Sequence, residues 1–285
     1  MQIDTVQGET PLGSWTYSTW RPPRLAGIVD HVWHYEGPTS HRRKRVFPNG
    51  RVEVLLNFAA PYRVLAGAGA ELCRVAWLGG PQVEPLVVEQ PARQDVLGLR
   101  LRPAGAYALL ARPIHEVTGL SVDLADLIGP AAGELIERCY AAGSVADRFR
   151  IAVGWIVQRL ARARGMDEAV AWAVARIDES GGTVPIAALR ARAGLSKARL
   201  VALFREQVGL TPKLHARVVR FHQTLGMLQG GAGRLTDVAL DACFYDQPHM
   251  NAEFRALGGL TPREFMAARH PVGDGSTASD GPPVR

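Results

Sequence analysis

The chain has 285 residues, of which 47% are hydrophobic, which suffices for two domains with their own cores and excludes a fibre or a disordered chain. The formal net charge is +6, and three scattered cysteines without a CxxC pair are typical of reduced thiols in a cytoplasmic protein. The sequence contains no apolar run near the roughly 18 residues of a membrane span, and no signal peptide pattern. We therefore expect a cytoplasmic location and no membrane contact.

The first hundred residues predict a small β-barrel or sandwich. Residues 1–13 are polar and contain two glycines and a proline, so we expect a loosely held lead. Apolar runs separated by Gly and Pro predict strands at 51–58, 75–78, 85–88 and 96–101. Asn49-Gly50, placed just before the first run, is the turn signal of a β-hairpin. The basic run 41–45 is expected to be a solvated loop, with a nucleic-acid contact as the alternative.

From Pro103 the hydrophobic period becomes helical. We expect helices at 103–111, 124–128, 131–141 and 145–162, and the last of these has an apolar stripe that would face a core. The stripe ends at 161–165, which we take as a domain boundary before a further helix at 167–179. The expected domains are therefore 1–165, 166–270 and a tail, 271–285, whose Gly, Ser, Asp and Pro content predicts disorder.

The stretch 184–269 contains one pattern twice. Phe204-Arg205 recurs 50 residues later as Phe254-Arg255, and Gly209-Leu210-Thr211-Pro212 recurs as Gly259-Leu260-Thr261-Pro262. Each copy predicts two short helices around a tight turn, at 186–192 and 196–208 and again at 236–242 and 246–257. Ser196 and Asp246 are suited to cap the second helix of each pair, because their side-chain oxygens accept from free N–H groups of the first turn. This arrangement is typical of a helix-turn-helix that binds the DNA major groove.

The helix expected at 212–229 would separate the two copies by about 27 Å, at 1.5 Å per residue. That length is close to one turn of DNA, about 34 Å, so two recognition helices could bind successive major grooves. Residues 180–270 also contain 12 Lys and Arg against 6 Asp and Glu, whereas residues 1–179 contain 20 against 19. The basic excess therefore lies in the repeated part, as a phosphate-binding surface requires.

The repeated part resembles the double helix-turn-helix domain of the AraC/XylS family of transcription regulators. The residues that carry the resemblance are Gly194-Leu195-Ser196, Leu200 and Phe204-Arg205 in the first copy, and Ala239, Phe244, Asp246, His249-Met250 and Phe254-Arg255 in the second, with Phe265 and Arg269 closing. The Phe47-Pro48-Asn49-Gly50 hairpin and the strand-to-helix step at 98–103 are similar to the cupin-like domain of some AraC-type regulators. The resemblance implies that residues 1–165 sense a small-molecule effector, mediate a homodimer, or do both, and that an activator would contact RNA polymerase.

The residues expected to face double-stranded DNA are Ser196, Lys197, Ala198, Arg199, Val201, Ala202 and Arg205 in the first copy, and Gln247, Pro248, His249, Asn251, Ala252 and Arg255 in the second. The family usually has polar residues where Val201, Ala202 and Ala252 stand. Since amides suit adenine, we expect Gln247 and Asn251 to supply most base readout, and the basic residues mainly to bind phosphate. Cys243 stands where the family usually has Gly in the turn.

The candidate ligand-pocket residues are Trp33, Tyr35, Glu53, Asn57 and Arg100, with core packing as the alternative for the aromatic rings. His31 and His34 with Glu53 lack the spacing of a cupin metal site, so we expect no metal and no other cofactor. The sequence also lacks a nucleophile–base pairing, a phosphate-binding Gly loop and a Gly-x-Ser-x-Gly elbow, which argues against an enzyme.

These patterns predict an α+β protein, with a β-rich N-terminal domain that has a helical annex and an all-α C-terminal domain. Its expected function is AraC-type transcription regulation, with two recognition helices in successive major grooves. The alternative is a ligand-binding or interaction protein whose helix-turn-helix half has lost base discrimination. The apolar outward face of the first recognition helix is the feature that supports this alternative.

Overall fold

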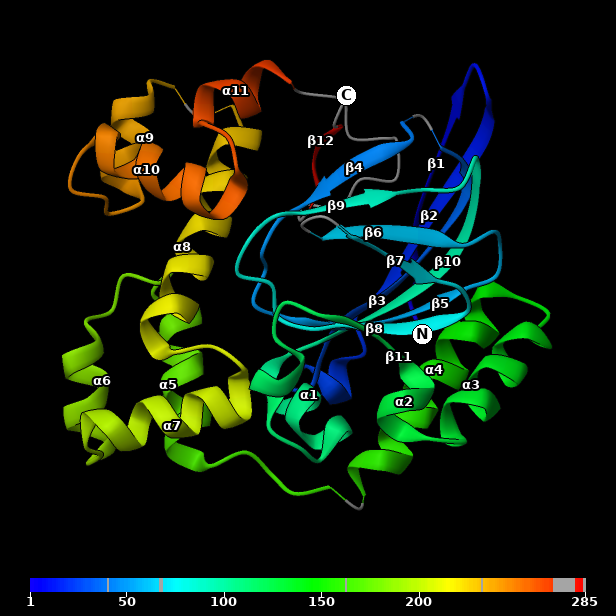
Figure 1. The fold of residues 1–285 in the computed structure, drawn as a ribbon, viewed down its shortest axis with the longest axis horizontal. Coiled ribbons are helices and arrows are strands. Elements are labelled where there is room, and N and C mark those ends of the chain that lie inside the picture. The colour runs from blue at the N-terminus through cyan, green and yellow to red at the C-terminus, as the bar shows by residue number, and fades with distance from the viewer. Residues whose placement is uncertain (40, 67–68, 162, 232, 269–279, 284–285) are drawn as a thin grey trace.

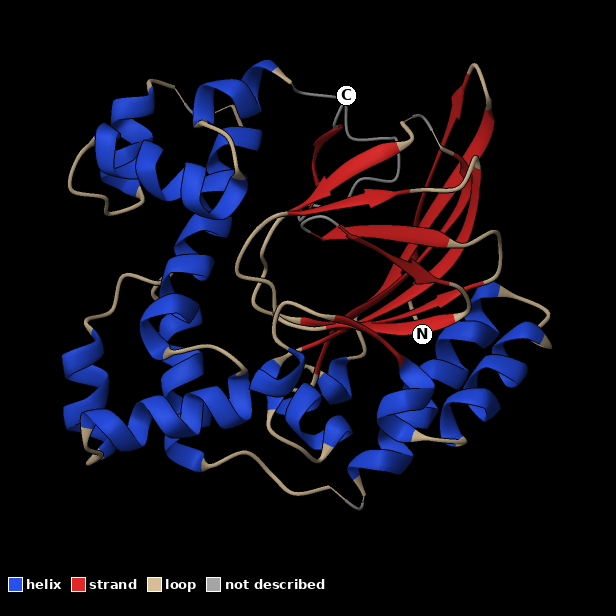
Figure 2. Cartoon of the chain, in the orientation of Figure 1, coloured by secondary structure: helices blue, strands red, loops and turns tan. Residues whose placement is uncertain are grey.

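The computed structural model describes residues 1–39, 41–66, 69–161, 163–231, 233–268 and 280–283. Antiparallel sheets make up the N-terminal part, and the C-terminal part is helical (Figures 1 and 2). The predicted α+β class is confirmed. Among the described residues the strands form two separate sheets that face each other. Of the two predicted alternatives, a sandwich and a barrel, the structure is therefore a sandwich and not a closed barrel.

The described part of the larger sheet has the order β1 (Asp4–Thr10), β2 (Gly13–Trp20), β3 (Val29–Pro38), β10 (Arg93–Leu101), β5 (Val52–Asn57), β8 (Ala76–Gly79) and β11 (Ser121–Asp123). The smaller sheet has the order β12 (Asp280–Pro283), β4 (Arg43–Val46), β9 (Leu86–Glu89), β6 (Tyr62–Ala66) and β7 (Gly69–Cys73). The central strand, β10, pairs with both β3 and β5 along most of its length. Strands therefore meet here that lie far apart in the sequence.

The two faces of the larger sheet have different partners because side chains alternate along a strand. On β5, Val52, Val54 and Leu56 are buried in a core that includes residues of the four helices α1 (Pro103–Leu110), α2 (Leu124–Ile128), α3 (Ala131–Tyr140) and α4 (Val145–Leu160). Their neighbours Glu53 and Leu55 instead face the space between the sheets. The strands and helices expected between 51 and 162 are thus confirmed to within a few residues.

Three local predictions for the N-terminal part are wrong. The expected lead forms the β1–β2 hairpin, whose residues on β1 are mostly exposed and polar, so no apolar alternation marked them. The basic run forms β4, a strand that pairs with β9 instead of remaining a solvated loop. Asn49-Gly50 does make a turn, with Gly50 at φ +64°, but the strands on either side of it belong to different sheets. The turn therefore connects the two sheets and closes no hairpin.

The expected disordered tail is corrected at one place. Residues 280–283 form β12, which pairs with β4, and the other residues of 271–285 lie outside the described part of the chain. An edge strand presents free N–H and C=O groups, so a segment with little apolar content can still pair with it through its backbone. Composition predicts how much apolar surface a segment can bury, but it does not predict backbone pairing with an edge strand.

The C-terminal helices form two units that share one long helix. The first unit contains α5 (Glu168–Glu179), α6 (Ile186–Ala193) and α7 (Lys197–Val208), and the second contains α9 (Leu235–Asp241), α10 (Gln247–Gly258) and α11 (Pro262–Ala267). The connecting helix is α8 (Pro212–Gln229). Each unit has its own apolar core, and α8 contributes Ala216 to the first core and Val218, Phe221, Leu225 and Leu228 to the second. The predicted repeat of two helix pairs around a long helix is confirmed.

The β-rich part contacts both units. The loop between β4 and β5, residues 47–51, lies against the long helix, and the carbonyl oxygen of Pro48 accepts a hydrogen bond of 2.5 Å from His222 Nε2 on α8. Tyr107 of α1 donates to Glu206 of the first unit at 3.0 Å, and Thr118 donates to the carbonyl oxygen of Gly209 at 2.9 Å. These contacts hold the helical part against one side of the sandwich.

His222 is expected to make the folded state sensitive to mild acid. Burial lowers the pKa of His222 to about 4, with the nearby charges of Arg100 and Arg51 acting in the same direction and the bond to Pro48 opposing them. In the unfolded chain His222 has its usual pKa, near 6.5, so the unfolded state binds this proton first as the pH falls. The contribution of His222 to the free energy of unfolding is therefore fully present above pH 6.5 and is lost as the pH falls toward 4. The expected loss is about 2 kcal/mol between pH 7.5 and 5. Urea unfolding at both pH values measures this loss. His222→Gln is the control, because glutamine can still donate to Pro48 but does not titrate, and an equal loss in that variant would contradict the assignment.

Candidate DNA-binding surface and ligand cavity

The second helix of each pair begins with the predicted cap. Ser196 Oγ accepts from the backbone N–H of Arg199 at 3.2 Å, and Asp246 Oδ1 accepts from that of His249 at 2.7 Å. Both helices end at a left-handed glycine, Gly209 with φ +85° and Gly259 with φ +67°. The following Thr-Pro starts the next helix each time, and Thr261 forms a full capping box with Glu264. The local signals of the sequence thus determine where both candidate recognition helices begin and end.

Most residues expected to face DNA lie at the surface. The exposed members of this set are Ser196, Lys197, Ala198, Arg199, Ala202, Arg205, Pro248, His249, Ala252 and Arg255, and the half-buried members are Val201, Gln247 and Asn251. The residues assigned to the inward stripes, Leu200, Leu203, Phe204, Met250 and Phe254, are buried. Asn251 Oδ1 is buried without a hydrogen-bond partner among the described residues. The residues predicted to face outward on the two helices are therefore exposed or half-buried, and those predicted to face inward are buried.

The two helices have the same orientation relative to the sandwich. In Figure 1, α7 and α10 both run from the outer edge of the molecule toward the β-rich part, so their capped ends point away from it. Their C-terminal glycines meet that part: a Cβ at Gly209 would lie 2.8 Å from Ile114 Cγ2, and one at Gly259 would lie 3.2 Å from Pro85 Cγ. The docked β-rich part thus leaves the N-terminal turns of both helices accessible.

The long helix α8 holds the second recognition helix through charged groups. Arg217 Nε donates to Glu253 Oε2 of α10 at 2.7 Å, and both side chains are largely buried. Arg220 lies over the Phe244 ring, with its guanidinium carbon 4.9 Å from the ring centre, and it also donates to the carbonyl oxygen of Cys243. Arg217 and Arg220, both half-buried, thus have partners within the protein. The basic residues left for phosphate contact on the recognition helices are the exposed ones named above.

The turn of the second pair is one residue longer than that of the first. The left-handed residue of the first turn, Gly194, lies two positions before the cap Ser196, whereas Cys243, with φ +53°, lies three positions before the cap Asp246. Tyr245 lies in this longer turn and is 89% exposed. This large aromatic side chain at the N-terminal end of a recognition helix is a candidate DNA contact that the sequence did not predict. A comparison of the two copies could have predicted an exposed residue here, because their turns align only with a one-residue gap.

Cys243→Gly is expected to stabilise the protein by about 1 kcal/mol. A residue with a Cβ is strained at positive φ by about 1–2 kcal/mol, and glycine is not, although glycine has more freedom to lose on folding. The thermal midpoint should rise by about 2–4 °C. Cys243→Ala is the matched control, since it removes the thiol but keeps the strain. A glycine variant that unfolds at or below the temperature of the alanine variant would be inconsistent with strain at this turn.

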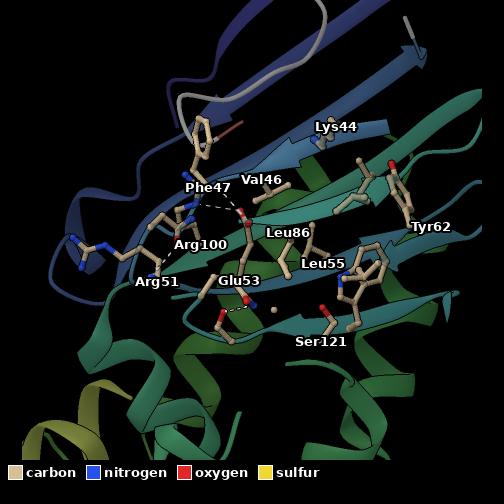
Figure 3. A pocket seen from close by; sticks show the side chains of 18 of the residues that line it. Lys44, Val46, Phe47, Arg51, Glu53, Leu55, Tyr62, Leu86, Arg100 and Ser121 are labelled. Carbon is tan, nitrogen blue, oxygen red and sulfur yellow. Dashed lines mark hydrogen bonds and ion pairs between the residues drawn. The ribbon is translucent and has the colours of Figure 1, made fainter. Parts of the chain in front are cut away.

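A cavity of about 120 Å³ lies between the two sheets (Figure 3). Its walls include the aromatic side chains Trp33, Tyr35, Tyr62 and Trp77, together with apolar side chains such as Leu55 and Leu86. Four of the five predicted pocket residues, Trp33, Tyr35, Glu53 and Arg100, line this cavity. Because an apolar cavity of about 150 Å³ can hold benzene, this cavity matches the size of a single-ring molecule.

A buried ion pair forms the polar end of the cavity. Arg100 Nε lies 3.2 Å from Glu53 Oε1, and the Trp33 ring N–H donates to the same oxygen at 2.7 Å. Burial by itself would raise the pKa of Glu53, but the charge of Arg100 and the hydrogen bond from Trp33 hold it below its usual value. Glu53 is therefore ionised at neutral pH. Figure 3 shows this pair on the same side of the cavity as Phe47 and Arg51.

Asn57 does not line the cavity. Its Nδ2 atom donates to the carbonyl oxygens of Ala59, Ala60 and Arg74, and its Oδ1 accepts from Ala59 N, so the side chain holds the end of β5 together. The two histidines considered for a metal also have separate partners. His31 binds Asp30, and His34 binds Asp95, which is shared with Arg148.

The described residues contain no cluster of three or more His, Cys, Asp or Glu side chains placed to hold a metal ion. In the same part of the chain, no helix combines the length and the apolar character that crossing a membrane requires.

Comparisons with known proteins follow the two-part architecture. Residues 189–268 match a family described as a helix-turn-helix domain, and residues 21–123 match a family described as a domain of unknown function, DUF6597. The chain is 32% identical over 66 residues to the HTH-type transcriptional activator RhaR of Yersinia pseudotuberculosis and of Yersinia pestis, a match that covers 23% of this chain and 23% of RhaR. It thus spans less than a quarter of the length of these relatives.

Among solved structures, ToxT of Vibrio cholerae has a TM-score of 0.47 at 9% identity, over 88% of this chain and 98% of that chain. The AraC-like transcriptional activator CuxR has a TM-score of 0.32 at 14% identity, over 70% of this chain and 80% of that chain. With its two capped recognition helices on one connecting helix, the chain carries an AraC-type helix-turn-helix domain behind an N-terminal domain of the DUF6597 family.

Proposed function

We propose that this protein is a transcription regulator that binds double-stranded DNA with two recognition helices in successive major grooves. The observation that carries the proposal is the common orientation of α7 and α10, whose capped N-terminal turns point away from the sandwich. Exposed Lys197, Arg199 and Arg255 supply the positive charge that phosphate binding needs. As the resemblance to AraC-type regulators implies, its place of action is the cytoplasm, and its role is binding and not catalysis.

The cavity between the sheets is the proposed effector site. Flat aromatic walls and a volume near that of a benzene site favour a single-ring molecule, and the Glu53–Arg100 pair favours a polar group at one end of it. Phe47, Asn49 and Arg51 of the loop that contacts the DNA-binding helices also line the cavity. A bound effector would therefore touch a segment that is in contact with the DNA-binding half.

The effector site can be tested without knowing the natural ligand. Because Trp33 and Trp77 line the cavity, phenol, benzoate and aniline binding should quench tryptophan fluorescence of the full-length protein. Leu55→Phe adds bulk to the cavity wall and should weaken whichever compound binds. Quenching that is absent for all three compounds, or unchanged in the variant, would count against the site.

Three further features of the regulator are proposals, the first from the sequence pattern and the other two from the resemblance. The first is the domain boundary near residue 165, supported by the separate apolar cores on either side of it. The second is a homodimer, which sedimentation of the purified protein would detect. The third is contact with RNA polymerase if the protein is an activator.

Selection from a pool of random duplexes tests the function directly. A regulator should enrich one sequence that contains two half-sites about one helical turn apart, and it should prefer that duplex over a scrambled one by about 10³-fold or more. Equal affinity for all duplexes would instead support the alternative, an interaction protein with a degenerate helix-turn-helix half. The half-buried, apolar Val201 on the outer side of α7 is the feature that favours that alternative.

A further inference from the structure

The loop at residues 47–51, called the bridging loop below, joins β4 to β5 and leaves the sandwich to enter the helical part. Its Asn49 Oδ1 accepts from Arg51 N at 2.9 Å, and Gly50 has φ +64°, so a local turn shapes it. Phe47, Asn49 and Arg51 of the loop line the cavity, and Phe47 and Arg51 also contact the DNA-binding helices. The loop is thus a short segment with contacts in both halves of the protein.

Phe47 completes the core of the second unit. Its side chain is 1% exposed and belongs to the apolar cluster formed by α8, α9, α10 and α11. The Phe47 ring lies 5.5 Å from the Phe221 ring in an edge-on contact and 6.0 Å from the Phe265 ring, centre to centre. A side chain from the β-rich part therefore occupies a core position of the helix-turn-helix unit that contains α10.

Arg51 holds the first unit. Its Nη2 atom lies 2.8 Å from Asp178 Oδ2 on α5, and His215 Nε2 lies 3.3 Å from the other oxygen of Asp178. Burial alone would raise the pKa of Asp178, but His215 and Arg51 lower it to about 2, so the carboxylate is charged. Arg51 and Asp178 are both mostly buried, so removing one of them would leave the charge of the other buried without its partner.

The two units are connected by α8 and also by the bridging loop. Their cores are separate clusters with no residue in common, and α8 contributes different residues to each. The bridging loop contacts one unit through Phe47 and the other through Arg51, so it links them by a second route. With the loop docked, the exposed residues of α7 and α10 stay accessible, so the loop does not block the DNA-facing side.

We propose that Phe47 and Arg51 of the bridging loop are positioning residues for DNA binding: they hold the two helix-turn-helix units at the spacing that lets both bind one duplex. Both side chains are buried against the helical units in this arrangement. Units held in the bound geometry lose less freedom on binding, so the affinity for two adjacent half-sites is higher than for units joined by α8 alone. The proposal rests on the proposed DNA-binding function.

Full-length protein and two duplexes test the proposal. The long duplex contains both selected half-sites, and the short duplex contains one. Phe47→Ala and Arg51→Gln should bind the long duplex at least fivefold more weakly than the wild type, with a shallower salt dependence, and the short duplex within twofold of it. Phe58→Ala and Arg148→Gln are matched controls, because both truncate contacts inside the β-rich part, and both should behave as the wild type. Phe47→Leu, which keeps an apolar side chain, should recover most of the loss.

Each outcome decides one question. Variants that bind the long duplex like the wild type overturn the positioning role, and variants that lose affinity for both duplexes equally do so as well, since they point to a damaged fold. If the wild type binds no duplex, the proposed function fails instead. Hydrogen exchange still tests the loop in that case: α9–α11 should exchange faster in Phe47→Ala than in Phe58→Ala, and equal rates overturn the proposal. Should Phe47→Ala not fold, Arg51→Gln, Asp178→Asn and their double variant take its place, with equal losses expected for all three.

Discussion

Replacing both Gln247 and Asn251 by alanine is expected to remove most sequence discrimination from the second recognition helix. The two residues are one helical turn apart and lie on the same side of α10, near its capped end. An amide can donate to and accept from adenine in the major groove, and each good pair contributes about 1–3 kcal/mol of discrimination. The double variant should therefore lose about 2–6 kcal/mol of preference for the selected duplex over a scrambled one.

Competition between the two duplexes measures that preference. Arg255→Ala is the control, because an exposed arginine near the end of α10 is expected to bind phosphate and to weaken all duplexes alike. A retained preference in the double variant, together with an altered preference in Ala198→Arg, would show that α7 performs the readout and that the assignment to α10 is wrong. Asn251 Oδ1 is buried without a protein partner among the described residues, so this side chain would have to change its rotamer before that oxygen could accept from a base.

Phe221→Ala is expected to destabilise the protein by about 3–5 kcal/mol, the usual range for deleting a buried phenylalanine ring. The side chain is 1% exposed and lies at the centre of α8. The centre of its ring lies 4.8 Å from that of the Phe254 ring and 5.5 Å from that of the Phe47 ring. Its removal therefore opens a cavity between the connecting helix, the second recognition helix and the bridging loop.

Urea unfolding measures the loss, and hydrogen exchange locates it. Faster exchange is expected in α9, α10 and α11, with little change in α1–α4. Phe149→Ala is the matched control, since Phe149 is equally buried but belongs to the core between the larger sheet and its helices, where the opposite distribution is expected. A Phe221→Ala variant that unfolds at the same urea concentration as the wild type would refute the central role of this ring.

Local chemistry in the sequence determined the helical half. The two copies spaced by 50 residues, the caps Ser196 and Asp246 and the glycines that end α7 and α10 act within a few residues of the chain, so the helices could be predicted almost to their ends. The apolar stripes determined which side of each helix is buried. Four of the five predicted pocket residues also line one cavity, because alternation along β3, β5 and β10 places them on one face of the larger sheet.

Only the tertiary structure decided which strands pair and where the two halves meet. Asn49-Gly50 predicts a turn both in a hairpin and in a connection between two sheets. Whether the flanking strands pair with each other depends on partner strands that lie far away in the sequence. The burial of Phe47 among α8 and α11, and the pairing of Arg51 with Asp178, join residues more than a hundred positions apart. Such contacts depend on how the surface of the folded β-rich part fits the surface of the folded helical part, and no pattern of residues close together in the sequence predicts that fit.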